Sequence, residues 1–436
     1  MKWSQYGRIT LAMVASLALG LSITACNPSF TLGFVYALNT KPNGAVHGIN
    51  GQINAYTIDS VSGALTQTAD SPFSSGGQYP VADAVDNRSK WLYVANEIDN
   101  SVVQFNIGID GKLYKAHTYN TPGTYPIAMT IDASSTYLFV VDTYAPGFNG
   151  VEPPNVNPIC GGGTGTAPGS IGSTGASQSC ANTTATQGCV VVYPINHSDG
   201  SLGSPVKDGG QSCFPIGSGP VLGSQPIGIT STAFVNYVYV ADQGTHTVYA
   251  YSINDSTGVL TPLSTNNFQA GVKPSAIISD PSGRFIYVTD QYANQLLGYD
   301  ILTGGALQSM VNGPFTTDLF PFGMAVDPRG KFLYVTNFNA NDVRAYNIDP
   351  STGNPVGTAG GTYGTGTGPT CITIEPAYGR FVYTANFLDN SVTGFELNPA
   401  TGVLTLDLNS PYPASGLPDC IAAAANGTHP VQNIVP

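Results

Sequence analysis

One short hydrophobic segment recurs seven times along the chain and restricts the fold more than any other feature of the sequence. Each copy is six residues long, carries β-branched and aromatic residues on both faces, and ends in Asp or Asn. A strand that is apolar on both faces must be covered on both faces, as the middle strands of radially stacked sheets are. The copies occupy residues 34–39, 91–96, 137–142, 237–242, 285–290, 332–337 and 381–386. The repeat therefore predicts an all-β protein built from seven similar sheets.

Two further strands accompany the repeats, one after each copy and one before every copy except the first. After the repeat comes an aromatic residue with an aliphatic residue two positions on, as at Tyr251 and Ile253. Before it comes a proline followed two positions later by a small residue, as at Pro226 and Gly228. Small side chains suit an innermost strand, because the sheets crowd together toward an axis. Turns that contain glycine then lead to a fourth strand.

These elements together predict a seven-bladed β-propeller of four-stranded antiparallel blades over residues 33–430. The first repeat has no inner strand before it, and the last inner strand, near Pro418, has no complete unit after it. We therefore expect the C-terminal strand to complete the N-terminal blade, because an unclosed ring would leave two exposed sheet edges.

The Tyr-Val-Ala-Asn sequence at 93–96 and the Tyr-Val-Thr-Asn sequence at 334–337 show the repeat in full. In this form it resembles the YVTN family of propellers, which is also grouped with lactonase-type or 6-phosphogluconolactonase-like seven-bladed proteins. The resemblance covers residues 33–430 and implies the seven-bladed fold, with lactone hydrolysis as the activity of the family. The repeated residues build blades rather than a site, so the function needs an argument of its own.

The N-terminus has the features of an export signal. Lys2 and Arg8 precede an apolar run over residues 9–23, and this run leads into Ile-Thr-Ala-Cys at 23–26. The arrangement resembles the lipobox of bacterial lipoproteins, which implies that residues 1–25 are a signal peptide and that Cys26 is acylated. We expect 26–32 to be a lipid-anchored linker and 431–436 a C-terminal tail. The chain is then exported and anchored in a membrane of the cell envelope, and Asn27 favours the outer membrane.

Two oversized loops lie on one face of the predicted propeller. They span residues 41–50 in the first unit and 143–188 in the third, whereas the turns of the opposite face are short. Irregular loops on a regular scaffold are common places for function, so we expect the loop-rich face to be the working face. The 143–188 insertion is rich in Gly, Ser and Thr, and is either a weakly structured flap or a lid or docking loop.

Six cysteines besides Cys26 suggest disulfides in an exported protein. Cys160 and Cys180 would tie the insertion to itself, and Cys189 and Cys213 would tie its base to a later loop. Cys371 and Cys420 hold equivalent positions on neighbouring inner strands, and either pair or remain small free thiols. Their spacing does not suggest a metal site, and we expect no metal and no cofactor.

Candidate site residues come from the loop-rich face. The Asp or Asn that ends each repeat is either a turn cap or, in a subset, part of a cation or sugar site. For catalysis the candidates are His246, Asp242 and Glu97, because hydrolysis needs a histidine or carboxylate side chain that accepts a proton from the attacking water. For binding, the loop-face candidates, mostly aromatic, are Tyr79, Asp142, Tyr144, Tyr292, Phe338 and Phe387.

Composition narrows the possible functions. Only 9% of residues are charged, the net charge is −12, and basic residues form no run, which argues against nucleic acid as a partner. The predicted loop face holds little basic charge beyond Lys41, Lys273 and Arg344, whereas a phosphorylated lactone needs a basic cluster. Our main interpretation is a monomeric envelope module that binds a protein, glycan or small ligand. The alternatives are a hydrolase of a neutral lactone and a structural component of the envelope.

Overall fold

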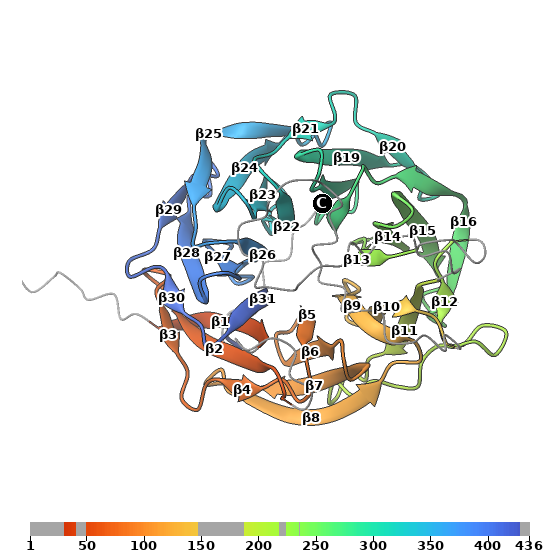
Figure 1. The fold of residues 1–436 in the computed structure, drawn as a ribbon, viewed down its shortest axis with the longest axis horizontal. Coiled ribbons are helices and arrows are strands. Elements are labelled where there is room, and N and C mark those ends of the chain that lie inside the picture. The colour runs from red at the N-terminus through yellow and green to blue at the C-terminus, as the bar shows by residue number, and fades with distance from the viewer. Residues whose placement is uncertain (1–29, 41–48, 147–186, 218–223, 235, 428–436) are drawn as a thin grey trace, which may run out of the picture.

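The structure is a computed structural model, and it describes residues 30–40, 49–146, 187–217, 224–234 and 236–427. Every regular element in these ranges is a β-strand, and the strands form seven sheets arranged around one axis (Figure 1). The predicted seven-bladed β-propeller is therefore confirmed. Within the same ranges, no helix has the length and apolar character needed to span a membrane.

Seven blades follow one another in chain order, each with its inner strand nearest the axis. The first contains β31 (Leu417–Ala425), β1 (Thr31–Thr40), β2 (Gln52–Asp59) and β3 (Leu65–Gln67), with β4 (Phe73–Ser74) beside β2. The second contains β5 (Pro80–Val85), β6 (Trp91–Asn96), β7 (Ser101–Ile107) and β8 (Leu113–Asn120). The third contains β9 (Thr124–Ile131), β10 (Tyr137–Tyr144), β11 (Cys189–Pro194) and β12 (Phe214–Pro215).

The remaining blades are built in the same way. The fourth contains β13 (Pro226–Ser231), β14 (Tyr237–Asp242), β15 (Thr247–Ile253) and β16 (Leu260–Gln269). The fifth contains β17 (Pro274–Ser279), β18 (Phe285–Asp290), β19 (Gln295–Ile301) and β20 (Leu307–Ser309), with β21 (Phe315–Thr316) beside β19. The sixth contains β22 (Pro321–Val326), β23 (Phe332–Asn337), β24 (Asp342–Ile348) and β25 (Pro355–Gly364). The seventh contains β26 (Pro369–Ile374), β27 (Phe381–Asn386), β28 (Ser391–Leu397) and β29 (Leu404–Leu406), with β30 (Tyr412–Pro413) beside β28.

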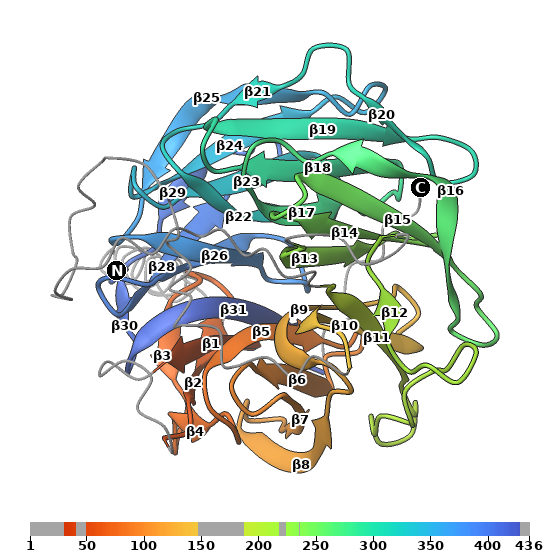
Figure 2. The same ribbon diagram turned by 45° about the vertical axis from the view of Figure 1, so that its right-hand side comes forward.

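The ring closes as expected, because β31 pairs with β1. The two strands are antiparallel, with a register that runs from Gly33 opposite Ala425 to Thr40 opposite Leu417. Figure 2 shows β31 between β1 and the inner strands of the neighbouring blades. The first blade thus takes its inner strand from the C-terminal part of the chain and its other strands from the N-terminal part.

The tyrosine of the repeat has a structural task that explains its recurrence. Its hydroxyl donates to a glycine carbonyl in the outer turn of the next blade, at 2.6–3.1 Å. The pairs are Tyr36 with Gly111, Tyr93 with Gly200, Tyr239 with Gly305, Tyr287 with Gly353, Tyr334 with Gly402 and Tyr383 with Gly63. The third blade has Phe139 in this position. These buried hydrogen bonds join neighbouring blades, so the repeat motif serves the architecture.

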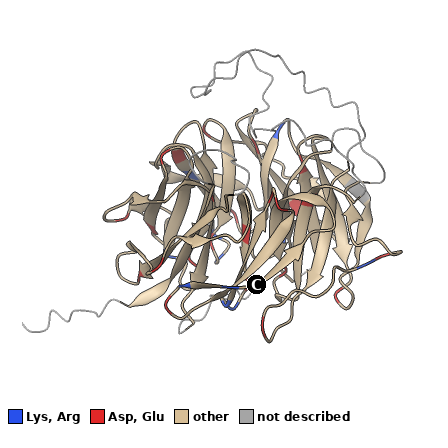
Figure 3. Cartoon of the chain, turned by 60° about the horizontal axis from the view of Figure 1, so that its bottom comes forward, with Lys and Arg blue, Asp and Glu red and all other residues tan. Residues whose placement is uncertain are grey.

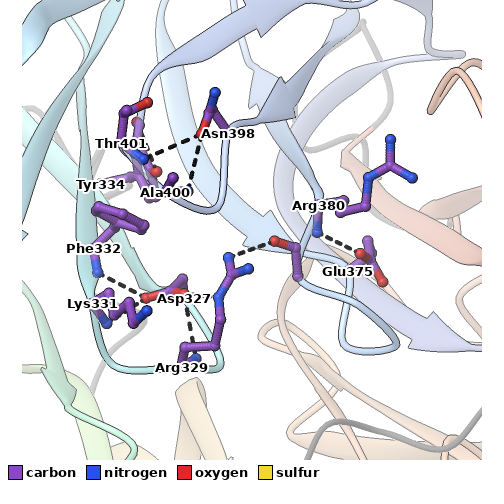
Figure 4. Close-up of polar contacts among 12 residues, drawn as sticks. Asp327, Arg329, Lys331, Phe332, Tyr334, Glu375, Arg380, Asn398, Ala400 and Thr401 are labelled. Carbon is purple, nitrogen blue, oxygen red and sulfur yellow. Dashed lines mark hydrogen bonds and ion pairs between the residues drawn. The ribbon is translucent and has the colours of Figure 1, made fainter.

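The face opposite the loop-rich one consists of tight turns held by acidic side chains. Figure 4 shows one of them, in which the Asp327 carboxylate accepts from the backbone N–H groups of Lys331 and Phe332 at 2.6 and 2.7 Å. Arg329 forms an ion pair with the same carboxylate and donates to the carbonyl of Gly379 in the next blade. The arginines of this face are therefore turn and inter-blade residues.

The hydrophobic core lies between the blades. All six residues of β6, β18, β23 and β27 are buried, as a strand covered on both faces must be. Each cluster of buried side chains draws on two adjacent blades, as where Tyr334 of the sixth packs with Ile372 and Val382 of the seventh. Burial of this area between sheets is the main force that holds the ring together.

Candidate functional site

On the loop-rich face, the first residue after most repeats is fixed close to the axis. The backbone N–H of Glu97 donates to the carbonyl of Tyr79, the residue directly before the inner-strand proline, at 2.9 Å. Four other blades have the same bond, in the pairs Gln243 with Gln225, Gln291 with Lys273, Phe338 with Phe320 and Phe387 with Gly368. Since the inner strands surround the axis, these paired positions form what we term the axial ring (Figure 1).

The axial ring is chemically uneven. In the second blade it holds an acid and a tyrosine, in the fourth and fifth blades amides and a lysine, and in the sixth and seventh blades mainly aromatic residues. We call these parts the acidic sector (Tyr79, Glu97, with Asp419, Tyr125 and Tyr144 beside them), the amide sector (Gln225, Gln243, Lys273, Gln291) and the aromatic sector (Phe320, Phe338, Phe387, with Leu388). A ligand lying on the axis would therefore meet three different surfaces.

Glu97 is the most strongly perturbed group of the acidic sector. Burial, and to a lesser extent the charge of Asp419, raise the pKa of Glu97 to about 7. Burial raises the pKa of Asp419 to about 6, and burial together with both carboxylates raises the pKa of Tyr79 to about 12. The two carboxyl groups therefore lie near each other and near the Tyr79 hydroxyl. A carboxylate with a pKa near neutrality is suited to accept and return a proton.

Backbone strain fixes several aromatic residues at this face. Tyr79, Tyr125 and Phe320 have positive φ angles of 58°, 59° and 62°, a conformation that bulky residues rarely adopt. An asparagine side chain secures two of them, because Asn100 accepts from the N–H of Tyr125 at 2.7 Å and Asn294 accepts from that of Phe320 at 2.8 Å. These hydrogen bonds from loop asparagines therefore fix the positions of the Tyr125 and Phe320 rings.

The amide sector supplies hydrogen-bond donors and one cation. The ammonium group of Lys273 lies 4.8 Å from the ring centre of Tyr292, and its side chain is largely buried. Gln243 donates to the carbonyl of Pro274 at 3.3 Å, whereas the buried Oε1 of Gln291 has no hydrogen-bond partner in the described structure. A buried amide oxygen without a partner is costly, so Gln291 is available to a bound group.

Aromatic rings of the sixth blade and a leucine of the seventh form a continuous apolar surface. The ring centres of Phe320 and Phe338 are 6.0 Å apart, and those of Phe322 and Phe338 are 6.2 Å apart. Leu388 of the seventh blade borders Phe338 across Gly368, and half of its surface is exposed. Exposed apolar groups beside polar ones are typical of a surface that binds a ligand with a carbon skeleton.

The structure places the catalytic candidates in different surroundings. Asp242 is fully buried and caps a loop, because it accepts from the N–H of Gln225 and from the Ser224 hydroxyl. His246 is exposed at a loop tip, and no hydrogen bond joins it to Asp242 or Glu97 among the described residues. Of the three, only Glu97 lies in the axial ring.

The structure also places the binding candidates in different surroundings. Tyr79, Phe338 and Phe387 belong to the axial ring, and the buried Tyr144 packs edge-on against Tyr125 at 5.9 Å. Tyr292 lies exposed over Lys273. Asp142 is fully buried and accepts from the N–H of Gly123 at 2.9 Å, which is the capping role considered for the residue that ends each repeat.

Sequence reasoning missed Asp419 and Gln291 as site residues. Both occupy repeated positions, Asp419 directly after an inner-strand proline and Gln291 directly after a repeat. Aligning the seven units at these two positions would have shown that the side chains there vary from acid to amide to aromatic. That variation within a regular framework was the available signal.

The cysteines fall into three groups. Cys189 and Cys213 form a disulfide, with Cα atoms 5.6 Å apart, and this confirms one of the expected pairings. Asp142 is close to both sulfur atoms, but disulfide sulfurs are poor metal ligands, so this cluster is not a metal site. Cys371 and Cys420 are free thiols on β26 and β31. Cys160, Cys180 and most of the 143–188 insertion, like Cys26, lie outside the described residues.

Comparison with known proteins agrees with this geometry. The family model described as "Lactonase, 7-bladed beta-propeller" matches residues 45–145 and 263–374. A search of curated protein sequences gives no match. The chain is thus a seven-bladed β-propeller that matches the lactonase family model over these two segments, and the resemblance inferred from the repeats is confirmed.

Solved structures of the same class cover almost the whole propeller. The periplasmic gluconolactonase of Pseudomonas aeruginosa has a TM-score of 0.66 at 18% identity, over 90% of this chain and 99% of that one. A Bacteroides fragilis protein described as a candidate 6-phosphogluconolactonase has a TM-score of 0.64 at 18% identity, over 90% and 98%. A protein of unknown function from Desulfotomaculum acetoxidans has a TM-score of 0.60 at 12% identity, over 91% and 99%. At sequence identities of 12–18%, the similarity to these structures shows a shared fold only.

Proposed function

We propose that the chain hydrolyses a neutral, non-phosphorylated lactone at the axial ring. The observation that carries this proposal is the placement of Glu97, a carboxyl group with a pKa of about 7 beside Asp419 on the loop-rich face. The lactonase-type fold and the name of the Pseudomonas aeruginosa gluconolactonase add support from outside the chain. This reverses the order of our sequence-based interpretations, in which a binding module came first.

The reaction needs a base, a stabilised oxyanion and a proton for the leaving oxygen. Glu97 accepts a proton from a water molecule as that water attacks the lactone carbonyl carbon. The Lys273 ammonium and the amide groups of the amide sector stabilise the negative charge that develops on the carbonyl oxygen. When the ring C–O bond breaks, the proton held by Glu97 passes to the leaving alkoxide, and the product is a hydroxy acid.

Charge around the axial ring supports a neutral substrate. Glu97 and Asp419 oppose a phosphate dianion, and Lys273 is the only basic side chain in the described part of the axial ring. Arg344, the other nearby cation on this face, is paired with Asp318 at 3.3 Å. Charged residues are sparse over the propeller as a whole (Figure 3). The aromatic sector instead suits the carbon skeleton of the substrate.

The direct test is a pH-stat assay of the purified chain with glucono-δ-lactone, its 6-phosphate and δ-valerolactone. We expect hydrolysis of the neutral lactones above the spontaneous rate, and a loss of about 10²-fold or more for Glu97→Gln, as for removal of a general base. His246→Ala is the matched control on the same face and should retain full activity. Failure to hydrolyse any lactone would contradict the proposal and restore the ligand-binding module as the better interpretation.

A further inference from the structure

Cys371 and Cys420 face each other where the ring closes. Cys371 lies on β26, the inner strand of the seventh blade, and Cys420 lies on β31, the inner strand of the first. Their Sγ atoms are 3.0 Å apart, within about 1 Å of the length of a disulfide bond. A small side-chain rotation is therefore sufficient to join them.

The two thiols have different surroundings. The backbone N–H of Ile421 points to the sulfur of Cys371 at 3.3 Å and would stabilise a thiolate there. Hydrogen bonding to Cys371 and burial, together with the charges of Asp83 and Asp419, raise the pKa of the Cys420 thiol. Cys371 is therefore the better nucleophile and Cys420 the thiol that stays protonated until a base takes its proton.

Asp83 is placed to be that base. It lies on β5, and its carboxyl interacts with the Cys420 thiol. Burial raises the pKa of Asp83 to about 7, and its buried Oδ2 has no hydrogen-bond partner in the described structure. A carboxylate with a free oxygen beside a thiol can accept the proton that the thiol must lose before it reacts.

We propose that Cys371 and Cys420 are a cystine-forming pair, and that oxidation covalently joins the seventh blade to the strand that closes the ring. The Cys371 thiolate attacks a small disulfide such as oxidised glutathione and releases one glutathione thiolate. Cys420 then passes its proton to Asp83, attacks the Cys371 sulfur of the mixed disulfide, and releases the second glutathione. The protein loses two electrons and two protons, and the glutathione disulfide is reduced to two thiols.

This cross-link does not depend on lactone hydrolysis. It connects residues 49 positions apart in the sequence and holds β31 against β26. Loss of β31 would expose an edge of β1, so a bond that keeps β31 in place protects the closure of the ring. An exported chain meets the oxidising conditions that this chemistry requires.

Peptide mass mapping of the full chain tests the pairing without any variant. The folded protein is reduced, transferred to a buffer of oxidised and reduced glutathione, quenched with an alkylating reagent and digested. We expect one linked peptide pair containing Cys371 and Cys420, besides the pair containing Cys189 and Cys213. Alkylation of both Cys371 and Cys420 after oxidation, or a link from either one to a different cysteine, would overturn the proposal.

Thermal unfolding tests the consequence for the ring. We expect oxidation to raise Tm by several degrees more in the wild-type chain than in the Cys371→Ala/Cys420→Ala variant, which keeps the other disulfide. Asp83→Asn should slow formation of the cross-link about tenfold or more without changing the pair that forms. Equal Tm shifts in the two chains would show that the pair does not hold the closure.

Discussion

The hydroxyl group of Tyr383 donates a 2.7 Å hydrogen bond to the carbonyl oxygen of Gly63, and so connects the last blade to the first. The equivalent tyrosine makes the same bond in five other blades. At the closure this bond joins parts of the chain 320 residues apart. The repeat tyrosine is therefore a connector between blades. Residues that bind or transform a ligand are expected at positions that differ from blade to blade.

Tyr383→Phe should destabilise the propeller. The change removes one buried hydrogen bond and leaves the Gly63 carbonyl without its donor, which costs about 1–3 kcal/mol. The free energy of unfolding from urea titration measures the effect. Tyr114→Phe, at an exposed tyrosine of β8, is the matched control and should change stability by less than about 0.5 kcal/mol. A smaller effect at Tyr383 than at Tyr114 would contradict the connector role.

Gly63→Ala should cost more than an ordinary glycine replacement. Gly63 has a φ of +72°, and a Cβ there would lie 2.3 Å from the buried ring of Phe381. We expect about 1 kcal/mol for the backbone conformation and about 1–3 kcal/mol more for the overlap. Gly209→Ala is the control, since Gly209 also has a positive φ but nothing within 4 Å of the added carbon. Equal losses in urea titrations of the two variants would disprove the packing argument.

Asp407 should make the propeller less stable as pH rises. This side chain is buried, neither carboxyl oxygen has a partner in the described structure, and burial with the charge of Glu396 raises its pKa to about 7. Between about pH 4 and 7 the folded state keeps this proton while the unfolded state loses it, so stability falls across that window and levels off above it. The shift corresponds to at most roughly 4 kcal/mol.

Asp407→Asn isolates this contribution. The variant should match the wild type near pH 4 and exceed its stability near pH 8, because the amide has no proton to lose. Urea titrations at several pH values give the comparison. A pH dependence that is unchanged in the variant would show that Asp407 does not titrate in this range.

Asp419→Asn should move the pH profile of hydrolysis. The charge of Asp419 contributes to the raised pKa of Glu97, so its removal lowers that pKa and lets Glu97 act as a base at lower pH. We expect the acidic limb of kcat/KM to shift downward while activity at pH 8 changes little. The profile of kcat/KM against pH checks this. An unshifted acidic limb of the kcat/KM profile would show that Asp419 does not influence the pKa of the general base.

Phe338→Ala tests the aromatic sector. The ring contacts Phe320 and Phe322 and borders the exposed Leu388, so its removal opens the apolar surface. We expect KM for a lactone with an alkyl substituent to rise about tenfold, with little change for δ-valerolactone. Leu406→Ser, at an exposed residue of the outer strand β29, is the control. An equal change for both lactones would place the ring outside the site.

The fold was predictable because its information is local and repeated. A strand such as β23, which is apolar on both faces, predicts its own burial, and the seven copies of it predict seven similar blades. The disulfide between Cys189 and Cys213 was also foreseeable, since Cys189 directly follows the long insertion and Cys213 lies in a later loop of a chain that we expect to be exported. The bond from Tyr383 to Gly63 was not, because it depends on which outer turn lies beside which repeat after the ring has closed.

The candidate site was predictable only in part. Glu97 was proposed from its position in a loop, but its raised pKa comes from burial and, to a lesser extent, from the charge of Asp419, which belongs to the other end of the described chain. His246 and Asp242 are close in sequence, yet one points to solvent and the other is buried as a cap. Distances across the axis come from ring closure, and a single unit of the repeat contains no information about them.

The pairing of β31 with β1 also bears on how the protein matures. Because β31 is synthesised long after β1, the edge of β1 stays unpaired while the intervening blades are made. During this interval the partly folded chain exposes a template for strand addition by other polypeptides. Chaperones that shield unpaired strand edges would therefore act on this protein before β31 pairs with β1.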